Sequence, residues 1–161
     1  MLLIIAVLAV GVTASSSDRL KVIVAPPATV PIATPQARTA EEQRYLDAVL
    51  PLTERLVGEG RLLSALGEAR SRNILELRTR SERFRETADE VIAMESASGV
   101  PPRMGAFSTA LNDGIASALV SIDDAQSAVF RFDWDQAQLS VSTFGTAVEQ
   151  IASAIDKVEQ R

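Results

Sequence analysis

Two long apolar stripes with helical spacing constrain this chain most, and they follow one another within residues 101–158. A repeat of about 3.6 residues places the side chains of each stripe on one face of a helix. Only residues 131–133 separate the stripes, which is short enough to require an antiparallel turn. Two such faces need further helices to cover them. The stripes contain Met104, Phe107, Leu111, Ile115, Ala118, Ile122, Ala125, Val129 and Phe132, then Ala137, Val141, Phe144, Val148, Ile151, Ile155 and Val158.

The first half of the chain carries start and stop signals for two further helices. Thr39 and Glu42 have the spacing of a capping box, in which each side chain satisfies a backbone N–H at the helix start. The apolar face that follows fails at Arg70 and Asn73, where the repeat calls for apolar residues. Asn73 is a favourable cap for a new helix. Gly99 and the two prolines after it then indicate where that second helix ends.

These signals predict helices over about 39–69, 73–97, 101–131 and 133–160, the last one capped by Asp133. The four segments are similar in length and their connections are short. We therefore expect an all-α domain, an antiparallel up-down-up-down four-helix bundle.

The first 38 residues have a different character. Residues 1–14 are apolar and uncharged, with small residues at the end, which is typical of a signal peptide. No Lys or Arg precedes them, so a truncated membrane anchor is the other interpretation; an N-terminal strand or buried helix is a third. Residues 15–38 are rich in Pro, Thr and Ser and predict an extended linker. We expect a bundle outside the cytoplasm, either secreted or attached to the cell membrane by its N-terminus.

Composition excludes several classes of function. The formal net charge of −5 argues against a general nucleic-acid binder. The chain has no Cys and no His, which removes disulfides, the commonest general base and the commonest metal ligands. There is also no Gly-rich phosphate loop. We therefore expect no enzymatic activity, no catalytic residues, no cofactor and no metal site.

Two features remain as candidate binding residues. One is a run of six Arg over residues 70–85, and the other is a concentration of aromatic residues at 130–134. In the predicted bundle both connections lie at the end opposite the linker, where Arg and aromatic side chains commonly dominate binding. The alternatives are that the Arg form ion pairs between helices, with residues 72–80 level with about 118–126 and so with Asp123 and Asp124, and that the rings plug the bundle end. The candidate partner-binding residues are Arg70, Arg72, Phe130, Arg131, Phe132 and Trp134.

The layout of apolar leader, Pro-rich tether and Ala- and Leu-rich helices resembles a loose class of exported bacterial helical proteins. That resemblance implies a tethered or secreted helical head, here with an unknown protein partner. The leading hypothesis is a non-enzymatic bundle that acts through protein–protein contact. The alternative is a bundle that binds a small apolar ligand between helices, in slack near Gly58, Gly60, Gly67 and Gly114.

Overall fold

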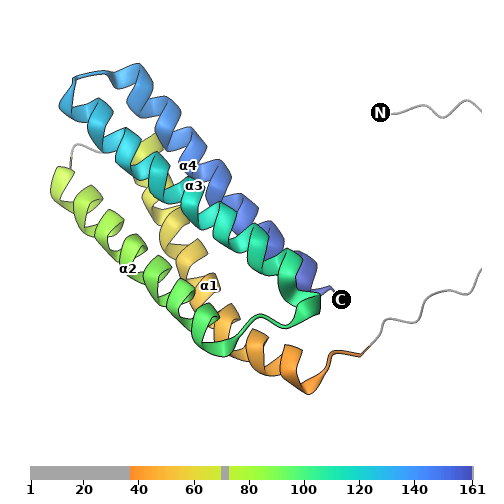
Figure 1. The fold of residues 1–161 in the computed structure, drawn as a ribbon. Helices are drawn as coiled ribbons and strands as arrows, with labels where there is room; N and C mark the ends of the chain where they lie inside the picture. Colours follow the sequence, from red (N-terminus) through yellow and green to blue (C-terminus); the bar gives the residue numbers. More distant parts are fainter. Residues whose placement is uncertain (1–36, 70–72, 161) are drawn as a thin grey trace, which may run out of the picture. The chain divides into compact units, whose positions relative to one another are not determined.

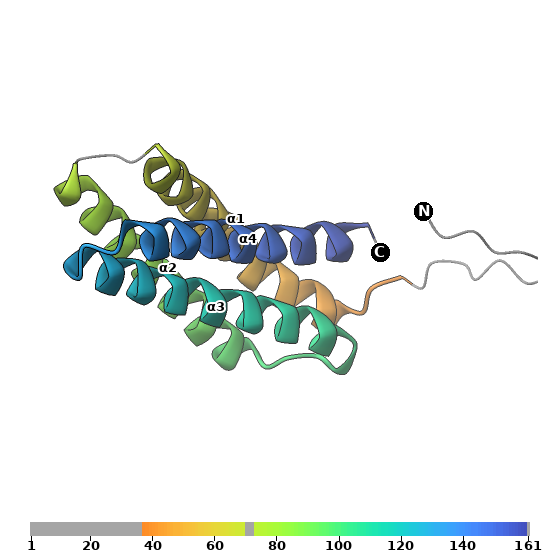
Figure 2. The ribbon, with the colours of Figure 1, turned by 90° about the horizontal axis from the view of Figure 1, so that it is seen from above.

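The computed structural model describes residues 37–69 and 73–160, which form four helices packed against one another (Figures 1 and 2). The predicted all-helical fold with four packed helices is confirmed. The expected leader at 1–14, nearly all of the linker at 15–38, and Arg70 and Arg72 lie outside the described residues. The helices are α1 (Ala40–Glu68), α2 (Ile74–Ser98), α3 (Gly105–Phe130) and α4 (Trp134–Glu159), with the short 3₁₀ helix η1 (Pro102–Met104) before α3.

Side-chain caps define where three of the helices begin. The Thr39 hydroxyl accepts a hydrogen bond from the Glu42 N–H at 3.1 Å, and the Glu42 carboxylate accepts one from the Thr39 N–H at 2.8 Å. Asn73 caps α2 through its side-chain oxygen, and Asp133 caps α4 in the same way. Gly99 ends α2 with a φ of 67°, a conformation that favours glycine. The caps expected at these positions are therefore confirmed.

The connection between α2 and α3 is longer than the sequence suggested. Pro101 is extended and Pro102 opens η1, so α3 begins only at Gly105. These extra residues change which parts of α2 and α3 lie level with each other. Arg85, rather than a residue between 72 and 80, forms the ion pair with Asp123 at 2.6 Å. The expected ion pairing between these helices occurs, with a shifted register.

The core consists of the inward faces of all four helices. In α3 and α4 the largest fully buried side chains are Leu111, Ile115, Val148 and Ile151, all of which belong to the two predicted stripes. The end of the first predicted stripe is an exception, since Val129 and Phe132 are exposed and Ala128 is buried in their place. The largest fully buried side chains are Tyr45, Phe84, Leu46, Leu56, Leu111, Ile115, Ile151, Val49, Val91, Val148 and Thr53.

Three of the four glycines near which slack was expected mark close approaches between helices, so that expectation is wrong for Gly60, Gly67 and Gly114. A Cβ added at Gly60 would lie 2.7 Å from a Val148 methyl carbon, and one at Gly67 would lie 2.8 Å from Val141. A Cβ at Gly114 would lie 2.6 Å from Ile151. The space beside these three glycines is therefore filled by side chains of α4, and it leaves no room for a ligand.

Contacts across the helix interfaces show which ends lie together. Tyr45, early in α1, contacts Glu95, late in α2. Glu95 in turn contacts Asn112, early in α3. Gly67, late in α1, lies against Val141, early in α4. Of the four interfaces between neighbouring helices, that of α3 with α4 is the most extensive and that of α2 with α3 is the smallest.

Two glycines in α1 provide a matched test of this packing. Gly60→Ala should lower the free energy of unfolding by about 1–2 kcal/mol, because its methyl group forces Val148 or Phe84 to move. Gly58 is exposed with nothing within 4 Å of an added Cβ, so Gly58→Ala should raise that free energy by about 1 kcal/mol through helix propensity. Urea denaturation followed by circular dichroism measures both. Equal effects of the two substitutions would contradict the close α1–α4 approach.

Candidate functional site: an exposed aromatic turn

The turn between α3 and α4 is short and tightly hydrogen-bonded. The Asp133 N–H donates to the Ala128 carbonyl at 2.9 Å, and the Phe132 N–H donates to the Val129 carbonyl at 3.0 Å. This pair of bonds forms a Schellman motif that ends α3. Asp133 at once accepts a hydrogen bond from the Gln136 N–H at 3.1 Å and so caps α4. We call residues 130–134 the aromatic turn.

Phe132 occupies the position in this motif that usually belongs to glycine. Its φ is 57°, and it is the only non-glycine residue with positive φ in the described part of the chain. For a residue with a Cβ, the left-handed conformation costs roughly 1–2 kcal/mol. The Phe132 side chain is also 79% exposed, so burial does not offset this conformational cost.

The neighbouring rings are exposed as well. Phe130 is 84% exposed and Trp134 is 65% exposed. The alternative that these rings plug the bundle end is therefore wrong, because they point away from the core. Leu139, in the second turn of α4, is a further exposed apolar residue at 61%.

Charged residues alternate with the rings along the turn. Arg131 precedes Phe132, and Asp133 and Asp135 flank Trp134. Arg131 and Asp135 are exposed, and among residues 37–69 and 73–160 their side chains form no ion pair or hydrogen bond. Four of the six candidate binding residues thus lie together in one exposed segment.

The start of α2 lies at the same end of the bundle as the aromatic turn (Figures 1 and 2). There Ile74 is 74% exposed and Leu75 is 75% exposed. Sequence reasoning did not select these two residues as binding residues. The sequence feature that could have identified them is that two large apolar residues directly follow the Asn73 cap and lie outside the apolar stripe of the second helix.

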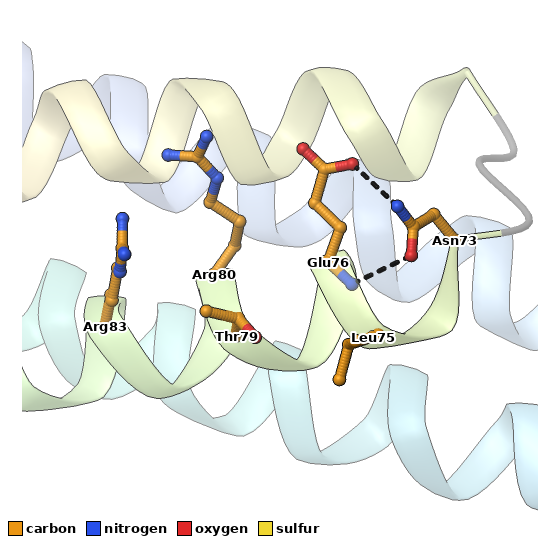
Figure 3. A pocket seen from close by; sticks show the side chains of 6 residues that line it. All are labelled: Asn73, Leu75, Glu76, Thr79, Arg80 and Arg83. Carbon is orange, nitrogen blue, oxygen red and sulfur yellow. Dashed lines mark hydrogen bonds between the residues drawn. The ribbon is translucent and has the colours of Figure 1, made fainter.

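A shallow pocket of about 340 Å³ lies on the same stretch of α2 (Figure 3). Asn73 and Glu76 form one edge, joined by a hydrogen bond from the Asn73 amide to the Glu76 carboxylate at 3.2 Å. Arg80 and Arg83 line the other part. All its lining residues come from the cap and first turns of one helix, so it is an open groove rather than an enclosed site. The lining residues are Asn73, Leu75, Glu76, Thr79, Arg80 and Arg83.

A buried polar cluster at the other end of the bundle is the remaining place where chemistry could occur. Glu95 is 4% exposed and accepts hydrogen bonds from the Tyr45 hydroxyl at 2.6 Å and the Asn112 amide at 2.7 Å. Each carboxylate oxygen therefore has a partner, and the partners come from α1 and α3. The cluster joins three helices and has no exposed reactive atom, which indicates a structural role.

A second buried carboxylate belongs to the first turn of α1. Glu42 is 2% exposed, caps its own helix and lies 3.4 Å from the Arg103 guanidinium. No buried side-chain nitrogen or oxygen atom in the described part of the chain lacks a hydrogen-bond partner. Within that part, no three Asp or Glu residues are grouped closely enough to hold a metal ion, and no helix is long and apolar enough to cross a membrane.

No protein-family model matches this sequence, and no curated protein or solved structure matches it either.

The buried cluster gives a prediction about pH. Burial raises the pKa of the Tyr45 hydroxyl above its usual value, and the hydrogen bond to Glu95 raises it further. A pKa that is higher in the folded than in the unfolded state stabilises the fold fully below about pH 10, and this stability is lost as the pH rises further. The tyrosinate absorbance should therefore stay absent in the folded protein at about pH 10–11 and appear together with unfolding.

Tyr45 is the only tyrosine in the chain, so the absorbance reports on this residue alone. Titration in urea, where the chain is unfolded, gives the reference pKa of the tyrosine, which should be about 10. A folded protein that ionises at the same pH as the unfolded chain would contradict the buried Tyr45–Glu95 contact.

Proposed function

We propose that this chain is a non-enzymatic helical-bundle protein that binds another protein through the aromatic turn. The observation that carries the proposal is Phe132, which combines a left-handed backbone with a ring that is 79% exposed. Glycine would fit this position without strain, and a polar residue would be better hydrated. Phe132 neither relieves backbone strain nor adds to the buried core, so contact of its ring with a partner would account for a phenylalanine at this position.

The composition of the turn supports a protein partner. Aromatic residues and Arg contribute most of the binding energy at many protein interfaces, and they are surrounded there by polar residues. The aromatic turn has this composition, with Phe130, Phe132 and Trp134 beside Arg131 and Asp133. The rings are held on a short turn between two rigid helices, so little conformational freedom would be lost on binding.

The proposal includes an up-down-up-down arrangement of the four helices. It is supported by the contacts that pair early residues of one helix with late residues of the next, such as Tyr45 with Glu95, and by the contact of Gly67 with Val141. Arg38 enters the bundle beside the last turn of α4, where its guanidinium donates to the Val158 carbonyl. The chain thus enters at the end opposite the aromatic turn.

The proposal also includes the expected location of the protein outside the cytoplasm. A signal peptide or membrane anchor at 1–14, followed by the extended linker at 15–38, would export the bundle or tether it outside the cytoplasm. Because the chain enters opposite the aromatic turn, a tethered bundle could present the turn away from the membrane. This orientation would leave the rings accessible to a partner.

Stability and binding should change in opposite directions at Phe132. Phe132→Gly removes the strained backbone and should raise the free energy of unfolding by about 1 kcal/mol. The same substitution, and Trp134→Ala, should abolish capture of a partner by the full chain in cross-linking pull-downs from its native host. Thermal melts and capture are measured on the same preparations.

Val120→Ala is the matched control, because Val120 is an exposed apolar residue of α3 (58% exposed) outside the aromatic turn. It should leave capture unchanged. Capture that survives both Phe132→Gly and Trp134→Ala would overturn the proposal, as would equal loss in the Val120→Ala control.

A further inference from the structure

We infer that the partner bound by the aromatic turn is a second copy of this chain, paired about a two-fold axis that passes beside the turn. The inference rests on the proposed function, because it takes the aromatic turn to be a protein-binding surface. It adds the identity of the partner, which follows from the order of charges along the turn.

The aromatic turn is complementary in charge to itself. Arg131 precedes Phe132 along the chain and Asp135 follows it in the first turn of α4, and both are exposed. Neither side chain has an ion-pair partner among the described residues. Asp133 differs, because its carboxylate is already engaged in capping α4. Arg131 and Asp135 are therefore the two charges that remain available next to the rings.

A two-fold axis converts this order into two identical ion pairs. In such an interface every contact occurs twice: if residue i of one copy contacts residue j of the other, then residue j of the first copy contacts residue i of the second. Arg131 of each copy would face Asp135 of the other, and the rings of Phe130, Phe132 and Trp134 would pack between them. This gives an apolar centre with a charged rim, the usual anatomy of a protein interface.

Charge also distinguishes this partner from the alternatives. The whole chain carries a net charge of −5, so two copies repel in general and need local complementary charges to associate. An anionic lipid surface would be repelled by Asp133 and Asp135, which flank Trp134. A second copy instead offers Arg131 to Asp135.

Charge exchange tests the inference on the full chain by sedimentation velocity over a range of concentrations. The unaltered protein should show a concentration-dependent dimer. Arg131→Glu alone places a carboxylate opposite Asp135 in both pairs, and Asp135→Arg alone places a guanidinium opposite Arg131. Each single variant should therefore dimerise at least about tenfold more weakly than the unaltered protein.

Restoration is the decisive part of the test. In an equimolar mixture of the two single variants, a mixed dimer places the introduced carboxylate of one copy opposite the introduced guanidinium of the other. Its second pair keeps the native Asp135 and Arg131. The mixture should regain the dimer, and so should the double variant R131E/D135R. Circular dichroism melts establish that each variant is folded, since D135R also removes a favourable charge from the first turn of α4.

A monomeric unaltered protein at all concentrations would overturn the inference, as would single variants that dimerise like the parent. So would binding of the monomer to phosphatidylcholine vesicles through Trp134, followed by its fluorescence. In these cases, loss of capture in Phe132→Gly and Trp134→Ala would still support a different protein partner. Failure of the proposed function would instead leave capture intact in those variants.

Discussion

The close approach of α1 to α4 is the constraint on which the rest of the structure depends. Gly60 and Gly67 of α1 receive Val148 and Val141 of α4, and a Cβ at either glycine would meet a methyl carbon at 2.7 or 2.8 Å. The first and last helices thus pack against each other, and the ring of four helices is closed. Close packing of this kind permits few alternative registers, because a shift by one residue would bring side chains into the glycine positions.

Buried polar contacts add specificity to this apolar interface. Glu95 binds Tyr45 of α1 and Asn112 of α3, so a change of register in either neighbour would leave a buried carboxylate without a partner. Exposed ion pairs such as Arg61 with Glu149 contribute less, since water and salt screen them. The bundle is therefore defined by packing along its length and by one polar cluster that joins α1, α2 and α3. The aromatic turn contains the strained Phe132 and the exposed rings. The stability of the packed core offsets the conformational free-energy cost of the left-handed Phe132 backbone.

Much of the fold could be predicted from local chemistry, because each signal acts within a few residues. The caps at Thr39, Asn73 and Asp133 are formed by side chains three residues from their partners, and the core follows a simple repeat. Contacts between helices could not be predicted in the same way. A glycine has no side chain to indicate what lies beside it, so Gly60 and Gly67 were interpreted as slack. The helical repeat also failed to predict the exposure of Phe132, because the Schellman motif ends α3 before this residue and the 3.6-residue periodicity no longer applies there.

The candidate site was predictable in composition but only partly in geometry. The cluster of rings at 130–134 was visible in the sequence, whereas its left-handed residue and its full exposure depend on how α3 ends. The Arg run was harder to interpret, since η1 shifts the register and Arg85 is the residue that meets Asp123. Ile74 and Leu75 were missed because exposed apolar residues at a helix start follow no repeat.

The closed α1–α4 interface can be tested most directly by an engineered disulfide, because the chain contains no Cys that could compete. A Cβ added at Gly145 would lie 4.0 Å from the Ser64 Cβ, which is within the range that a disulfide spans. The double variant S64C/G145C should form an intramolecular disulfide completely under mild oxidation, as measured by the mass of the intact protein before and after thiol alkylation. The pair S64C/T146C, with its second Cys at the exposed neighbouring position, should remain mostly reduced. Free thiols at both positions in the oxidised S64C/G145C protein would contradict the account.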